Sequence, residues 1–66
     1  MSKTAQNRIR KTREAVPELI RIAAKTHRRP VVRLTAVLAA WCDLAGIPGW
    51  TPEMVDYVER QVKKAS

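Results

Sequence analysis

The stretch PVVRLTAVLAAWCDLAG, residues 30–46, decides the fold of this 66-residue chain. The polar side chains after its first proline are Arg33, Thr35 and Asp43. These three positions do not share one face of a helix, and a helix that is apolar on nearly all sides is a buried helix. The stretch therefore predicts a buried helix over residues 30–45, around which the rest of a small domain packs.

Proline and glycine mark the two ends of this predicted helix. Pro30 suits a first helical position, because the N–H that it lacks would have no partner within the helix. Gly46 is well placed to adopt the left-handed backbone conformation that commonly ends a helix, and Pro48 cannot continue one.

Two further helices are predicted ahead of this one, over residues 3–15 and 17–27. In the first, one narrow strip carries side chains at helical spacing, namely Ala5, Ile9, Thr12 and Val16. Pro17 removes a backbone donor and disfavours helical geometry at the residue before it. A break or kink at Pro17 is therefore predicted between the two helices.

The fourth predicted helix covers residues 52–65 and has the clearest start. Thr51 precedes Pro52 and offers a hydroxyl to the free N–H groups of the first turn. Trp50 is placed to pack on Val55 as a hydrophobic staple. Because no segment alternates with the period of a strand, we predict one all-α domain over residues 1–66. It is a small four-helix domain whose third helix is buried.

Positive charge is concentrated in the first half of the chain. Residues 1–33 carry a net charge of +8 and residues 34–66 a net charge of −1, which together give the +7 of the whole chain. An excess confined to one half creates a directed field, for which polyanions are the natural partners. The candidate nucleic-acid- or anion-binding residues are Arg8, Arg10, Lys11, Arg13, Arg21, Lys25, Arg28, Arg29 and Arg33.

Three of these cations surround the start of the predicted third helix. Arg29 stands where Ser, Thr, Asp or Asn normally caps a helix, and omitting such a cap costs about 0.5–2 kcal/mol. A bound anion would offset this cost, because first-turn N–H groups and the guanidinium groups of Arg28, Arg29 and Arg33 would converge on it. The alternative hypothesis is that Arg28 and Arg29 only keep a loop soluble.

Duplex or structured nucleic acid fits this chain better than single strands, because no aromatic residues are interleaved with the basic ones. Gln6 and Asn7 are expected on one outward arc, where they are able to read base edges. Residues 38–58 have the outline of a helix-turn-helix, but the turn is long and acidic residues open its second helix. We therefore interpret the chain as a small basic nucleic-acid-binding regulatory protein that acts through its N-terminal half, with DNA favoured over RNA as its partner.

The alternative function is a small regulator or inhibitor of the phage or plasmid type, which binds an acidic or nucleic-acid-binding surface of a host protein. A partner or homodimer interface is proposed at Trp41, Trp50 and Tyr57, because such residues are typical interface anchors. Core packing of the two tryptophans is the favoured alternative, since this small core has no phenylalanine. Attachment to anionic membranes ranks last, because the first helix lacks Trp, Phe or Leu that would insert.

The residues that carry chemistry are sparse. His27 and Cys42 are the sole histidine and cysteine, and they lie on different predicted helices, whereas a Cys–His pair needs hydrogen-bond reach. Neither zinc-ligand spacing nor a glycine-rich phosphate loop occurs. We expect no enzymatic activity, no metal and no cofactor. A single cysteine, a polar N-terminus and the lack of an 18-residue apolar run favour a cytoplasmic protein without a membrane span.

Overall fold

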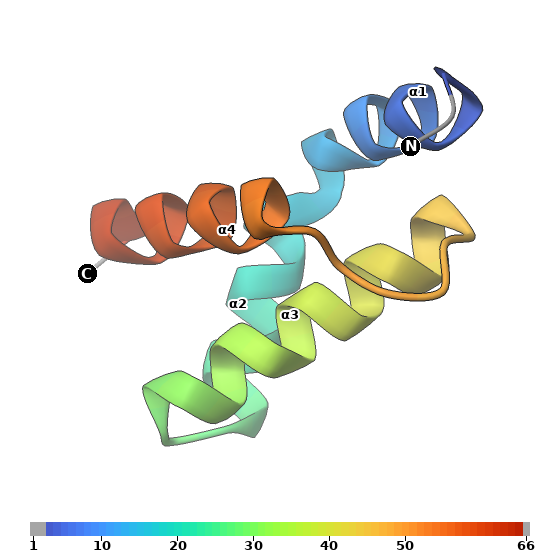
Figure 1. Cartoon of the computed structure of the whole chain (residues 1–66). Coiled ribbons are helices and arrows are strands. Elements are labelled where there is room, and N and C mark those ends of the chain that lie inside the picture. The colour runs from blue at the N-terminus through green and yellow to red at the C-terminus, as the bar shows by residue number, and fades with distance from the viewer. Residues whose placement is uncertain (1–2, 66) are drawn as a thin grey trace.

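The structure, a computed structural model, describes residues 3–65 (Figure 1). These residues are mostly helical and contain no strand, so the predicted all-α class is confirmed. The elements are α1 (Lys3–Thr12), the 3-10 turn η1 (Arg13–Ala15), α2 (Val16–Thr26), α3 (Pro30–Ala45) and α4 (Pro52–Ala65). The bounds of α3 and α4 are those that the sequence predicts.

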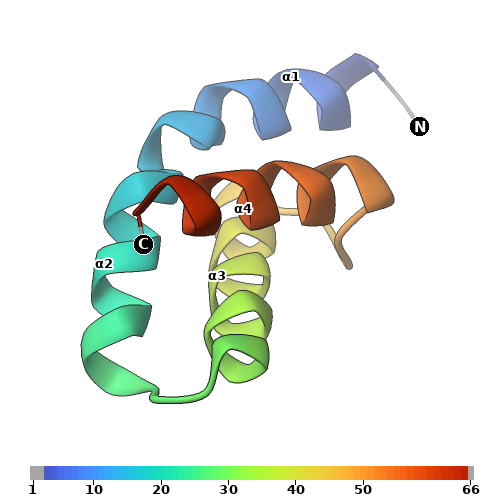
Figure 2. The same cartoon turned by 90° about the vertical axis from the view of Figure 1, so that its left-hand side faces the viewer.

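The junction of the first two helices differs from the prediction. The α-helical part of α1 ends at Thr12, three residues earlier than predicted, and η1 follows it. Pro17 is the second residue of α2, where its missing N–H costs no hydrogen bond. The chain changes direction between α1 and α2, as Figures 1 and 2 show, and this change falls around η1, ahead of Pro17.

Helices α2 and α3 run side by side in opposite directions and are joined by residues 27–29 (Figure 2). The His27 N–H donates to the Ala23 carbonyl across 2.8 Å and closes α2. The carbonyl of His27 in turn accepts a hydrogen bond from Arg33 Nε, 2.5 Å away. Arg33 therefore ties the first turn of α3 to the end of α2.

The core forms around α3, which contacts each of the other three α-helices. Trp41 is its largest member and is 1% exposed, and Met54 and Val58 of α4 are equally buried. The remaining buried residues are Val16, Ala23, Val37, Leu38, Cys42 and Ala45.

The predicted burial of α3 is correct along one face only. Val31 is 73% exposed and Leu44 55% exposed, so apolar side chains near both ends of α3 face solvent. The physical reason is the small size of the domain: three short neighbours leave part of the central helix uncovered, and the first turn of α3 lies far from α1 and α4 (Figure 2).

The predicted end of α3 at Gly46 and the predicted cap of α4 at Thr51 are both confirmed. Gly46 follows α3 in the left-handed conformation, with φ of 67°, and the Ile47 N–H donates to the Cys42 carbonyl across 3.1 Å. At the start of α4, the Met54 N–H donates to Thr51 Oγ1 across 3.3 Å. These two residues fix the loop that places α4 over the core.

Candidate nucleic-acid interface

Eight cations lie in two segments that contain no Asp or Glu, residues 1–12 and residues 25–33. Each segment has a net charge of +4. By contrast, residues 13–24 are neutral and residues 34–66 carry −1. We call the two groups the α1 cluster and the hairpin cluster. The α1 cluster consists of Lys3, Arg8, Arg10 and Lys11, and the hairpin cluster consists of Lys25, Arg28, Arg29 and Arg33.

The two clusters lie at opposite ends of the molecule. In Figures 1 and 2, α1 occupies one end and the α2–α3 turn occupies the other. The molecule measures 34 Å along its longest axis and is under 20 Å across, at 19 and 18 Å. The cationic N-terminal half therefore forms two separate surfaces.

The α1 cluster is displayed on a helix that has no fully buried residue. Lys3, Arg10 and Lys11 are exposed. Arg8 is also exposed, but its guanidinium reaches the C-terminal end of α3, where a Cβ added at Gly46 would lie 3.3 Å from Arg8 Nη1. A cation near a helix C-terminus is stabilising, so Arg8 also has a local structural role.

Within the hairpin cluster, Arg28 and Arg29 are fully exposed. Arg29 is the N-cap residue of α3, and its side chain makes no capping hydrogen bond, as predicted. The predicted convergence of three guanidinium groups on an anion is weakened, because the half-buried Arg33 is already bonded to the His27 carbonyl. In the part of the chain that the structure describes, neither Arg28 nor Arg29 forms an ion pair.

Two other predicted cations have partners within the chain. The guanidinium of Arg13 lies over the ring of Tyr57, 5.5 Å from its centroid, in a cation–π contact. Arg21 pairs with Glu18 across 3.3 Å. Both side chains are exposed. Glu18 partly offsets the charge of Arg21, whereas the neutral ring of Tyr57 leaves the positive charge of Arg13 in place.

The three residues proposed for a protein interface lie in different surroundings. Trp41 belongs to the core, where its ring packs on Tyr57 with centroids 5.7 Å apart and planes at 60°. The favoured alternative of core packing is confirmed for Trp41. Trp50 is 44% exposed and lines a shallow depression together with Val55, its predicted staple partner.

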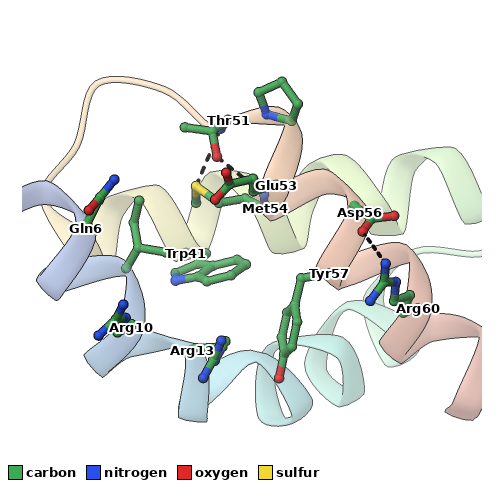
Figure 3. Close-up of a pocket in the computed structure, with 12 residues that line it drawn as sticks. Gln6, Arg10, Arg13, Trp41, Thr51, Glu53, Met54, Asp56, Tyr57 and Arg60 are labelled. Carbon is green, nitrogen blue, oxygen red and sulfur yellow. Dashed lines mark hydrogen bonds and ion pairs between the residues drawn. The ribbon is translucent and has the colours of Figure 1, made fainter. Parts of the chain in front are cut away.

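A groove of about 700 Å³ runs between α1 and α4, and the sequence gives no direct sign of it (Figure 3). Arg10 and Arg13 lie on its α1 side, and Glu53 and Asp56 on its α4 side. Gln6 also lines the groove, and both it and Asn7 are exposed to solvent. The remaining lining residues are Ile9, Trp41, Thr51, Pro52, Met54, Tyr57 and Arg60.

The lone cysteine lies in the core. Burial raises the pKa of the Cys42 thiol, and the neighbouring Asp43 carboxylate raises it further. The thiolate, which is the nucleophilic form, is therefore disfavoured there. Among the described residues, no three His, Cys, Asp or Glu side chains are grouped closely enough to hold a metal ion, and no helix has the length and apolar character needed to cross a membrane.

Comparison with models of protein families, with curated proteins and with solved structures finds no match to this chain. A function is therefore inferred from the charges, the exposed side chains and the groove of the chain itself.

Proposed function

We propose that this protein is a small DNA-binding regulatory protein that contacts the phosphate backbone of duplex DNA through its two cationic clusters. The observation that carries the proposal is the pair of acid-free segments, each with a net charge of +4, whose cations are mostly exposed. Such surfaces attract polyanions and raise their association rates.

The number of available cations sets the expected strength of the electrostatic contribution. Arg8 and Arg33 are engaged within the chain. The six other cluster residues are exposed, namely Lys3, Arg10, Lys11, Lys25, Arg28 and Arg29. Three of these residues belong to each cluster, so a duplex held by one cluster has about three phosphate contacts. The logarithm of its binding constant then falls with the logarithm of salt concentration with a slope of about −3.

Duplex DNA is favoured over single strands because the clusters lack an aromatic platform. Stacking of bases on exposed aromatic rings is a main source of single-strand affinity. In this structure the indole of Trp41 is buried, and Arg13 lies over the ring of Tyr57. Phosphate contacts position a protein on DNA without selecting a sequence, so we expect similar affinity for unrelated duplexes.

The test is a gel shift with two duplexes of unrelated sequence, each about two helical turns long. Salt is varied from about 50 to 200 mM. The proposal predicts that both duplexes bind with similar affinity, with a salt slope of about −3. No binding at the lowest salt, or binding that does not weaken with salt, would contradict it.

The groove between α1 and α4 favours a second candidate function, a regulator or inhibitor of the phage or plasmid type that binds a host protein. Glu53 and Asp56 on the α4 side would repel a uniform polyanion, whereas Arg10 and Arg13 on the α1 side attract acidic groups. Such a groove, with apolar Ile9 and Met54 in its lining, fits a protein helix that carries an apolar stripe flanked by both charges. An acidic protein surface would also complement the two clusters.

Filling the groove separates the two candidate functions. Gln6 is exposed and lines the groove, so Gln6→Trp narrows it without disturbing the core. A protein partner that occupies the groove would lose affinity for Q6W, while duplex binding through the clusters would persist. A captured host protein that binds wild type and Q6W equally would show that the groove is not its site.

A further inference from the structure

The surface that joins the two clusters is unsuited to DNA. Residues 34–59, which form most of α3, the following loop and the first half of α4, contain no Lys or Arg but four acidic residues. These are Asp43, Glu53, Asp56 and Glu59. Along the other connection, residues 13–24 are neutral overall, with Arg21 paired to Glu18. Neither connection continues the positive surface from one end to the other.

The distance between the clusters makes them electrostatically independent. The 11-residue helix α2 separates them, and at about 1.5 Å per residue it spans about 16 Å. Screening in physiological salt acts over about 8 Å, so phosphates held at one end gain little from exposed cations at the other. A duplex bound at one end therefore leaves the second cluster free to attract another polyanion.

We propose that the α1 cluster and the hairpin cluster bind two different duplex segments, so that one protein molecule bridges them. This inference rests on the proposed DNA binding and adds that the protein holds two segments together. Each site is sequence-independent, because exposed Lys and Arg side chains contact phosphates. The hairpin site is centred on Arg28 and Arg29, and the α1 site on Arg10 and Lys11.

A capture assay measures bridging directly. One duplex is fixed to beads, a second duplex carries a fluorophore, and the protein is added in increasing amounts at low salt. Wild type should carry fluorescence to the beads, and excess protein should abolish this signal, because every duplex then binds its own protein molecules. The signal therefore rises and falls with protein concentration, as expected for a bivalent connector.

Variants of each cluster test whether both ends are needed. Arg28→Gln/Arg29→Gln removes two cations from the hairpin, and Arg10→Gln/Lys11→Gln removes two from α1. All four side chains are exposed, so the fold should be retained, which circular dichroism checks. Each variant should still bind the duplex on the beads but lose capture of the second duplex.

A matched control removes the same charge elsewhere. Arg21→Gln/Arg60→Gln neutralises two exposed cations that pair with Glu18 and Asp56, and capture should persist. If wild type binds DNA without capturing the second duplex, bridging is wrong while DNA binding stands. If both single-cluster variants still capture the second duplex, the bridge is formed by association of protein molecules that each bind one duplex. The inference is then again wrong. The absence of any DNA binding would overturn the proposed function itself.

Discussion

The indole N–H of Trp41 donates a hydrogen bond to Thr12 Oγ1 across 2.7 Å, which links the C-terminal half of α3 to the last residue of α1. The same hydroxyl donates to the Arg8 carbonyl, 2.7 Å away, within α1. Because α1 has no fully buried side chain, this bond and the half-buried Ile9 hold the helix in place. The position of the α1 cluster thus depends on Thr12 together with Ile9.

Thr12→Val should destabilise the protein. The substitution keeps the size of the side chain but leaves the buried indole N–H without its acceptor, which costs about 1–3 kcal/mol in the free energy of unfolding. Urea denaturation followed by tryptophan fluorescence measures the change. Thr12→Ser keeps the hydroxyl and serves as the control. Equal stability of T12V and wild type would show that the bond contributes nothing.

Gly46→Ala should also destabilise the fold. A residue with a Cβ at φ of 67° costs about 1–2 kcal/mol in the left-handed conformation. The new Cβ would also lie 3.3 Å from Arg8 Nη1, so the Arg8 side chain must shift. Gly49→Ala is the matched control, because nothing lies within 4 Å of its added Cβ and its φ is not positive. Thermal melting of both variants should separate them, with a lower midpoint for G46A only.

Of the hairpin arginines, Arg33 should contribute to the stability of the fold, whereas Arg28 and Arg29 should not. Arg33→Gln removes a hydrogen bond from a charged donor to the His27 carbonyl, a class of bond worth about 1.5–3 kcal/mol, and partial exposure places it near the lower end. Arg28→Gln/Arg29→Gln removes two exposed cations and should leave the midpoint of unfolding close to that of wild type. An equal loss of stability in both variants would contradict this division.

The thiol of Cys42 should make stability depend on alkaline pH. Its pKa is raised in the folded protein, so folding favours the protonated thiol. Above the ordinary pKa of a cysteine, the unfolded chain loses this proton first, and the free energy of unfolding therefore falls as pH rises. Cys42→Ala should reduce that decline when urea denaturation is compared at neutral and alkaline pH. An identical pH dependence in C42A would show that the thiol does not contribute.

The features that sequence predicts well are those that depend on a residue and its near neighbours. The end of α3 at Gly46 and the cap of α4 at Thr51 follow from local backbone chemistry. The burial of Trp41 follows from its place in an apolar helix. The two acid-free segments are also visible in the sequence, although their placement at opposite ends of the molecule is not.

The features that sequence misses depend on contacts between distant segments. The groove exists because α1 rests on α3 through Thr12 and Trp41, while α4 lies some forty residues further along the chain. The structural role of Arg33 depends on its reach to a carbonyl six residues earlier. Val31 is exposed because the hairpin extends beyond the other two helices, which periodicity alone does not indicate.

The most direct test of the proposed function compares the salt dependence of duplex binding for two variants of equal net charge. Arg28→Gln/Arg29→Gln removes two exposed cations of the hairpin cluster, and Arg21→Gln/Arg60→Gln removes two that are paired with carboxylates. Both pairs of substitutions are compared in Arg10→Gln/Lys11→Gln protein, where the hairpin cluster carries duplex binding. There the first pair should make the salt slope less steep by about 2, because two phosphate contacts are lost, while the second pair leaves the slope unchanged. Identical slopes with and without either pair would contradict a DNA-binding role for the hairpin arginines.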